Sequence, residues 1–283
     1  MQRWEAIIPL AGIVGCTLLT DIPDDASSGG PDHGASGSVD GGKNDAASDR
    51  DATVASTDSG NTSGDPGGPP SGKVTLDAVG PGNEGAGGKD KTSPLVWSHT
   101  TSGANRALFV SVTIDADPDN TVGVGAVKYE GVALTLLGTQ HANNKDSGYT
   151  TLWAMANPAA GAHPVSVEFT GAPAVILAGS ISFQGVDQTT PFRNVVQVGG
   201  TGNKAQASVA SAAQNMVVAS LVSACAITPP NGAQGWLRNV TCSNGGGNAA
   251  QSTLAGAQAV DVTYGIDADW WGIIAADVNA ATP

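Results

Sequence analysis

The sequence predicts an all-β protein, an antiparallel β-sandwich of jelly-roll or concanavalin-like type that follows an extended N-terminal tether. Three observations predict this fold class. Apolar and polar residues alternate in many short segments of residues 73–283, Gly, Asn and Pro clusters separate these segments, and no long amphipathic helical pattern occurs. Many short strands divided by turn signals are typical of sandwiches and jelly rolls.

Nine segments have the pattern of strands. They are 74–79, 107–114, 132–137, 149–155, 165–169, 175–183, 216–224, 257–264 and 270–276. Alternation, as in 107–114, places one face in the core and the other in solvent, which indicates antiparallel sheets. Segment 175–183 is more continuously apolar and predicts a strand buried on both faces. We expect the last strand to lie beside an early one, because a single sandwich must cover its edges.

The N-terminal residues have the plan of a secretory signal, in which one positive charge, Arg3, precedes a short apolar run. The run is too short for a spanning helix, which needs about 20 residues. The tetrad Ile13-Val14-Gly15-Cys16 resembles the lipobox of bacterial lipoproteins. The resemblance implies a signal peptide over residues 1–15, cleavage before Cys16, and fatty acyl chains such as palmitate attached there. Thr17, instead of Asp, then implies the outer membrane or cell surface. The alternative is an ordinary N-terminal segment with an unmodified cysteine.

Residues 16–72 have the composition of a disordered linker that would hold the following domain away from a membrane. Gly, Ser, Asp, Ala and Pro dominate, and large apolar residues are nearly absent after Thr20, so little burial can offset the entropy of ordering the chain. The segment carries ten acidic and two basic residues. Because like charges repel one another, this linker is expected to be extended.

The charge of the predicted sandwich excludes one class of partner. Residues 73–283 contain 14 acidic and 9 basic residues. A nucleic-acid-binding domain would require a basic face, so we expect no nucleic acid as a partner.

Three short motifs are the basis of a further resemblance, between the domain and a β module of bacterial surface proteins. They are Trp97-Ser98-His99, Asn105-Arg106 and Gly185-Val186-Asp187-Gln188. With the strand pattern between them, they resemble a β module that recurs in bacterial surface proteins and is similar in outline to lectin-like sandwiches. The resemblance implies a fold and transfers no catalytic residue.

Export through the predicted signal would place the cysteines of the domain in an oxidising compartment. With Cys16 lipidated, Cys225 and Cys242 remain as a pair that can close a disulfide, stabilising the domain by about 3 kcal/mol in the chain-entropy model. The alternative is two buried free thiols. A metal site at these cysteines is not expected, because no histidine lies near either one in the sequence.

The loop between these two cysteines contains the candidate ligand-binding residues. Trp236 could stack against a sugar ring, while Arg238, Asn231 and Gln234 could form hydrogen bonds with its hydroxyl groups. The alternative, which we favour, is that Trp236 is a core residue that closes one end of the sandwich. Of the adjacent Trp270 and Trp271, one is expected in the core and the other could be exposed.

A calcium site is the one cofactor that the sequence suggests. Asp115, Asp117 and Asp119 occur at alternate positions in a turn after a strand, and carboxylate oxygens at this spacing can surround Ca²⁺. Asp267 and Asp269 form a weaker pair. The alternative is an ordinary turn rich in Asp, Asn and Pro.

The sequence does not indicate a catalytic site. The nucleophile elbow and the zinc-binding His-Glu-x-x-His helix are absent. Glu130, Glu168 and Asp187 could serve a glycosidase only if two of them faced each other across a cleft.

Three functions remain open after these considerations. The first is a noncatalytic, lipid-anchored surface protein whose sandwich binds a glycan or another extracellular partner. The second is a polysaccharide hydrolase or lyase on a jelly roll. The third is a structural envelope protein without a specific ligand.

Overall fold

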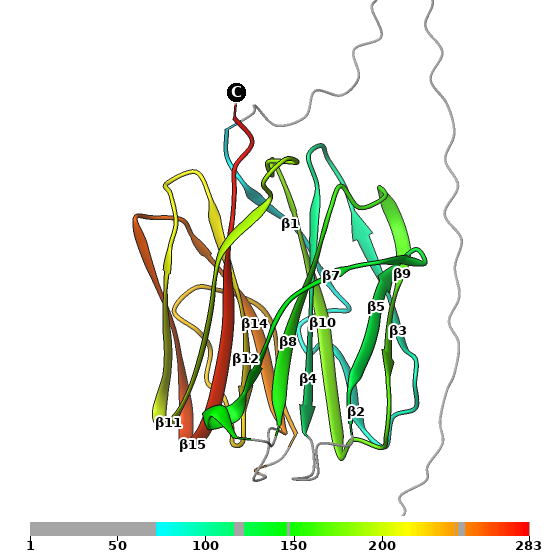
Figure 1. The fold of residues 1–283 in the computed structure, drawn as a ribbon, viewed down its shortest axis with the longest axis vertical. Helices are drawn as coiled ribbons and strands as arrows, with labels where there is room; N and C mark the ends of the chain where they lie inside the picture. Colours follow the sequence, from blue (N-terminus) through cyan, green and yellow to red (C-terminus); the bar gives the residue numbers. More distant parts are fainter. Residues whose placement is uncertain (1–71, 116–121, 146–147, 241, 243–246, 283) are drawn as a thin grey trace, which may run out of the picture. The chain divides into compact units, whose positions relative to one another are not determined.

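The computed structural model describes residues 72–115, 122–145, 148–240, 242 and 247–282 (Figure 1). These residues form fifteen strands and one short 3-10 helix, η1 (Ala142–Asn144), and every strand pairing among them is antiparallel. The all-β antiparallel sandwich is therefore confirmed. The predicted signal peptide, Cys16 and nearly all of the linker lie outside the described residues. No helix in the described part of the chain is long and apolar enough to cross a membrane.

The strands form three sheets. The central sheet contains, in spatial order, β1 (Thr75–Gly80), β10 (Val175–Gln184), β4 (Ala107–Asp115), β8 (Tyr149–Ala156) and β7 (Thr135–His141), with β2 (Ala86–Lys89) also paired to β10. The N-terminal sheet contains β3 (Leu95–Thr101), β9 (Gly161–Phe169), β5 (Val124–Tyr129) and β6 (Val132–Ala133). The C-terminal sheet contains β11 (Phe192–Ala210), β15 (Ala259–Val278), β12 (Met216–Ser223), β14 (Asn248–Ala255) and β13 (Ala233–Asn239).

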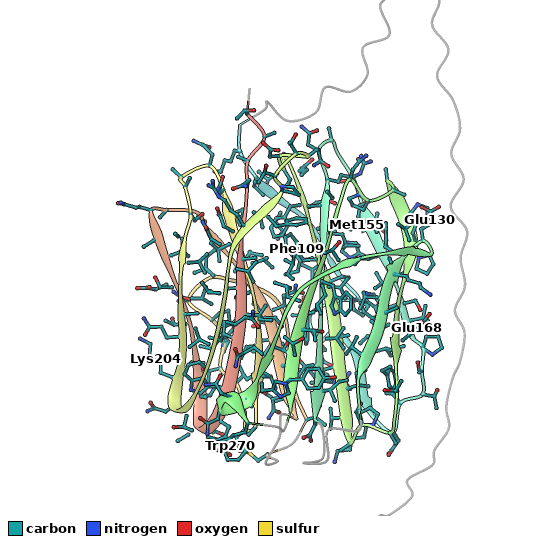
Figure 2. All side chains as sticks on the ribbon, in the orientation of Figure 1. Phe109, Glu130, Met155, Glu168, Lys204 and Trp270 are labelled. Carbon is teal, nitrogen blue, oxygen red and sulfur yellow. A yellow bond between two sulfur atoms is a disulfide. The ribbon has the colours of Figure 1, made fainter. Side chains whose placement is uncertain are left out.

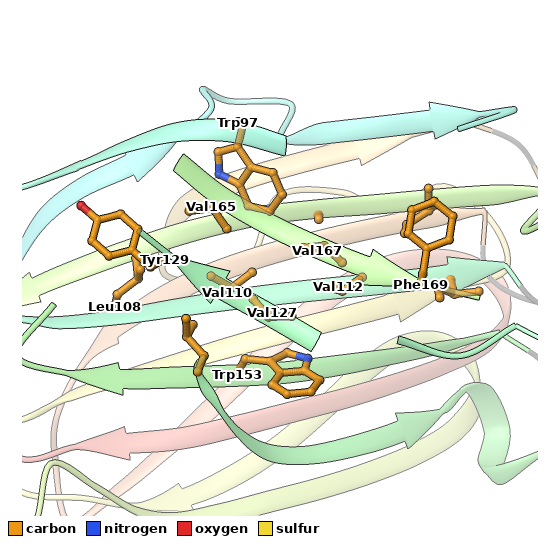
Figure 3. Packing of buried hydrophobic residues seen from close by; sticks show 14 of the residues in the cluster. Trp97, Leu108, Val110, Val112, Val127, Tyr129, Trp153, Val165, Val167 and Phe169 are labelled. Carbon is orange, nitrogen blue, oxygen red and sulfur yellow. The ribbon is translucent and has the colours of Figure 1, made fainter. Parts of the chain in front are cut away.

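The central sheet lies between the other two and is covered on both faces (Figure 1). On one face, Leu108, Val110 and Val112 of β4 pack against Val165 and Val167 of the N-terminal sheet, together with Trp97, Tyr129 and Trp153 (Figure 3). On the other face, Ala107 and Phe109 pack against Val218, Ile274 and Ala276 of the C-terminal sheet. All nine residues of β4 are buried.

This burial corrects one prediction and confirms another. Alternation over 107–114 predicted a solvated face, but a third layer covers the face that carries Ser111 and Thr113. Thr113 Oγ1 donates to Thr150 Oγ1 at 3.1 Å, and Thr150 Oγ1 lies 2.7 Å from Ser220 Oγ of the C-terminal sheet. Thr113 and Thr150 therefore belong to a hydrogen-bond chain that reaches the C-terminal sheet, whereas Ser111 Oγ is buried without a hydrogen-bond partner among the described residues. The prediction that 175–183 is buried on both faces is confirmed, because β10 is buried from Val175 to Phe183.

The C-terminal sheet folds over its own outer face. β11 and β15 pair along nearly their whole length, with a register shift between Gly202 and Lys204. Beyond that shift, Val209, Val262 and Tyr264 pack against Leu221 and Ile273 of the same sheet. The two predicted strands 257–264 and 270–276 are thus one long strand. Its neighbours are β11 and β12, so the expectation that it lies beside an early strand is wrong.

Candidate functional site

The predicted glycan platform is part of the core. Trp236 is fully buried in β13, where its Nε1 donates to Gln251 Oε1 at 2.9 Å. Its ring lies directly over Gly179 and Gly85, where any Cβ would clash with it. The structure therefore corrects the ligand-binding interpretation of Trp236 in favour of the core alternative, because no face of the indole is open to a sugar.

Of the other three residues of that predicted site, Asn231 and Arg238 have structural roles and Gln234 is exposed. Asn231 donates from Nδ2 to Asp261 O at 2.8 Å and accepts from Thr263 N at 2.9 Å, so it pairs with β15 as a neighbouring strand would. Arg238 Nη1 donates to Gly87 O at 3.0 Å and holds β2. Gln234 is exposed on β13. The four residues do not converge on one open surface.

The predicted disulfide between Cys225 and Cys242 is confirmed, with the two Cα atoms 4.2 Å apart. It links the segment after β12 to the segment after β13. The loop that it closes contains Trp236, so the bond also restrains the strand that covers this part of the central sheet.

The calcium prediction stays a prediction. Asp115 ends β4 and is 7% exposed, whereas Asp117 and Asp119 lie outside the described residues. Within the described ranges, no group of three histidine, cysteine or acidic residues is arranged to hold a metal ion. Asp269 Oδ1 accepts a hydrogen bond from Trp270 N at 2.8 Å and so fixes the local backbone.

The three carboxylates considered for a glycosidase have separate partners. Glu168 forms an ion pair with Lys128 at 2.6 Å, and Glu130 lies 3.5 Å from His163 Nδ1. Asp187 Oδ1 accepts hydrogen bonds from the backbone N–H groups of Thr189 and Thr190, and these bonds lower the pKa of its carboxyl group. The described geometry thus gives no support to a pair that works across a cleft.

A buried group of Ser, His and Asp side chains was not predicted, because its members are far apart in the sequence. Ser180 Oγ lies 2.9 Å from His99 Nδ1 and accepts from Trp97 Nε1 at 3.0 Å. Nearby, Asp77 accepts from Ser182 Oγ at 2.8 Å and from Ser102 N at 2.9 Å, so its hydrogen bonds go to serines. In a catalytic triad the carboxylate orients the histidine, and the serine meets substrate. Here Ser180 is fully buried, so these residues fasten β1, β3 and β10 together.

The three motifs of the module resemblance also have structural roles. Val186 N donates to Asn105 O at 2.9 Å, and Asp187 N donates to Asn279 O at 2.9 Å. Arg106 Nε donates to Pro158 O at 2.8 Å, and Gln188 Nε2 donates to Arg106 O at 3.1 Å. These bonds tie together the loops that follow β3, β8 and β10 and connect them to the chain after β15.

A hollow of about 480 Å³ opens beside these loops, and we call it the edge hollow. Its lining is mostly apolar, as is usual for a ligand pocket. The lining residues are Tyr129, Val132, Ala133, Thr135, Ala154, Met155, Ala156, Asn157, Pro191 and Phe192. Figure 2 labels Met155 in the upper half of the molecule, between Phe109 and Glu130.

The edge hollow forms where the chain passes from one sheet to another. Glu130 and Gly131, with φ of 49° and 78°, make a two-residue turn between β5 and β6, as a type I′ hairpin requires. β6 is only two residues long, and the chain then crosses through buried Leu134 into β7. Val132, 60% exposed, is left at the margin. On the far side, Phe192 packs edge-to-face on Phe109 with ring centroids 4.9 Å apart.

The floor of the edge hollow contains an open strand edge. Asn157 N donates to Arg106 O at 2.8 Å, and Ala156 pairs with Ala107 of β4. By the alternation of antiparallel bonding, Ala156 directs its own N–H and C=O away from β4. On that side the ladder between β7 and β8 begins only at Ala154. Within the described residues, no strand therefore pairs with Ala156 on the side of the hollow.

No protein-family model matches this chain, and the searches of curated proteins and of solved structures found no significant match to it.

The burial of His99 predicts how the stability of the fold depends on pH. His99 is 2% exposed, and its burial lowers its pKa to about 4, although the charge of Asp77 opposes this shift. In the unfolded chain the pKa is near 6.5, so the unfolded state binds the proton more tightly. The contribution of neutral His99 to the free energy of unfolding is therefore complete above pH 6.5. It is lost progressively as the pH falls towards 4. The predicted loss from this residue is about 3 kcal/mol.

Urea unfolding of the chain at a series of pH values between 7 and 4 measures this loss. His99→Gln, which has no titrating ring, should show a smaller decrease over that interval. An equal decrease in both proteins would contradict the assignment.

Proposed function

We propose that this chain is a noncatalytic, lipid-anchored binding protein of the bacterial surface, and that its sandwich binds an extended, apolar segment of a partner polypeptide in the edge hollow. The anchor is the lipid on Cys16, residues 17–72 are the spacer, and the domain from residue 73 is the binding part. The open edge of β8 inside an apolar hollow is the observation that carries the choice of ligand.

The chemistry of the edge hollow favours a polypeptide strand. An extended segment can pair its backbone with the N–H and C=O of Ala156, as in other proteins that bind peptides by adding a strand to a sheet edge. Alternate side chains of that segment would then enter the space between Val132, Met155 and Phe192. The lining has few amide or charged groups, which a glycan would need for its hydroxyl groups.

The other chemically reactive residues support a noncatalytic role. Ser180 and His99 are buried, and Glu168, Glu130 and Asp187 each have their own partners. The disulfide between Cys225 and Cys242 supports a location outside the cytoplasm, since such bonds form and persist in oxidising compartments.

A synthetic peptide provides the test of ligand class. The probe is an octapeptide of alternating valine and threonine with a lysine at each end, titrated into the full chain carrying Cys16→Ser to prevent lipid attachment. We expect saturable binding that is weakened about tenfold or more by Ala156→Pro. The proline removes the N–H that faces the hollow and leaves the ladder with β4 intact, because that N–H does not take part in it.

Two leucine variants complete this test. Ala156→Leu should also weaken binding by filling the hollow, while Ala162→Leu, at an exposed position of β9, should bind the peptide as the parent does. Isothermal titration calorimetry gives the affinities, and near-ultraviolet circular dichroism verifies the fold. Absence of saturable binding, or equal binding by all variants, would overturn the proposal.

The anchor has its own test. Bacteria that produce the full chain and are supplied with labelled palmitate should incorporate the label, and the protein should partition into detergent. Cys16→Ser should abolish both properties, whereas Cys225→Ser combined with Cys242→Ser should retain the label. Label retained in the Cys16→Ser protein would contradict lipidation at this residue.

A further inference from the structure

Trp270 is unlike the other described tryptophans. Trp97, Trp153, Trp236 and Trp271 are each at most 8% exposed, and all belong to the hydrophobic clusters of the core. Trp270 is only partly buried and belongs to none of these clusters. Figure 2 shows it at the lower end of the molecule, away from Met155 at the edge hollow.

The backbone around Trp270 is held firmly. Its N–H donates to Asp269 Oδ1 at 2.8 Å, and its C=O accepts from Ala224 N at 3.0 Å. Ala224 directly precedes Cys225 of the disulfide. The aromatic side chain is therefore attached to an ordered segment, so that binding a ligand would require little loss of backbone entropy.

The register places polar and small residues on the face of the sheet that carries Trp270. Trp270 pairs with the exposed Thr201, and the next pair on the same face is Gly199 with Gly272. Asn144 of η1 lies against Gly199, since its Nδ2 donates to Gly199 O at 3.2 Å and its Oδ1 accepts from Gln140 at 2.8 Å, whereas Gln140 and His141 cover Gly272. Gly202, just beyond Thr201, has no heavy atom within 4 Å of the position that a Cβ would occupy.

We propose that Trp270, with Thr201 and Asn144, forms a second binding site that takes a β-linked hexose of an extracellular glycan. A β-1,4-linked glucose chain is extended and flat and presents faces of C–H groups that can pack on an indole ring, whereas an α-1,4-linked chain of the same sugar is helical. The hydroxyl of Thr201 and the unused hydrogen-bonding capacity of the Asn144 amide can then bind the rim of the sugar. This site is separate from the edge hollow and does not depend on peptide binding there.

Cellohexaose and maltohexaose distinguish this inference from weak, general sugar binding. Both are titrated into the full chain carrying Cys16→Ser, with the affinity measured by calorimetry and the tryptophan fluorescence recorded in parallel. We expect saturable binding of cellohexaose, whose units are β-linked, and binding of α-linked maltohexaose that is about tenfold weaker or more. Equal affinity for both sugars, or no saturable binding of cellohexaose, would overturn the inference.

Three variants locate the binding. Trp270→Ala should weaken cellohexaose binding about tenfold and remove the fluorescence change, while Trp270→Phe should keep most of the affinity because it retains an aromatic face. Ala156→Pro, at the edge hollow, should bind the sugar as the parent does. Retention of full affinity by Trp270→Ala, with its thermal unfolding unchanged, would place the sugar elsewhere and refute the site.

Discussion

Burial of the central sheet on both faces is the constraint on which the rest of the structure depends. β4 has no exposed residue, and β10 is buried over all but its last residue. A sheet in this position needs a covering layer on each side, and the chain supplies the N-terminal sheet from residues before Phe169 and the C-terminal sheet from residues after Phe192. The long antiparallel pair of β11 and β15 then covers the outer face of the C-terminal sheet, which would otherwise expose Leu221 and Ile273.

Three layers also determine what polar residues can do. Between the central and C-terminal sheets, the hydroxyl groups of Thr113, Thr150 and Ser220 bond to one another. On the opposite face, Ser180 bonds with Trp97 and His99. Groups of this kind are reactive when a cleft exposes them, but here they satisfy buried hydrogen bonds. The edge hollow remains because β7 begins opposite Ala154, two residues before the end of β8 at Ala156.

The sequence was sufficient for the fold class, the disulfide, most strands of the central sheet and the double burial of 175–183. The prediction was wrong where one sequence pattern is compatible with two structures. The Ser and Thr positions of 107–114 alternate with apolar residues as on a solvated strand, yet another sheet covers them. β11 and β14 were missed because their residues are largely small or polar, with few of the branched and aromatic residues that mark a strand.

The candidate sites were less predictable than the fold. Trp236 lay in a loop-like stretch rich in Gly and Asn, but β13 carries its ring to Gly179, where only a glycine leaves room for it. The edge hollow depends on where two ladders end, and His99, Ser180 and Asp77 meet only through pairing between distant strands. A single sequence contains no local signal for either arrangement.

Native-state hydrogen exchange of the full chain carrying Cys16→Ser would test the central claim most directly. We predict that the slowest amides lie in β4 and β10. In β8, the amide of Ala154, with Thr135 opposite, should exchange slowly, while that of Ala156 should exchange fast. Slow amides confined to the C-terminal sheet would contradict the central role of β4 and β10. Equal protection of Ala154 and Ala156 would contradict the open strand edge on which the binding proposal depends.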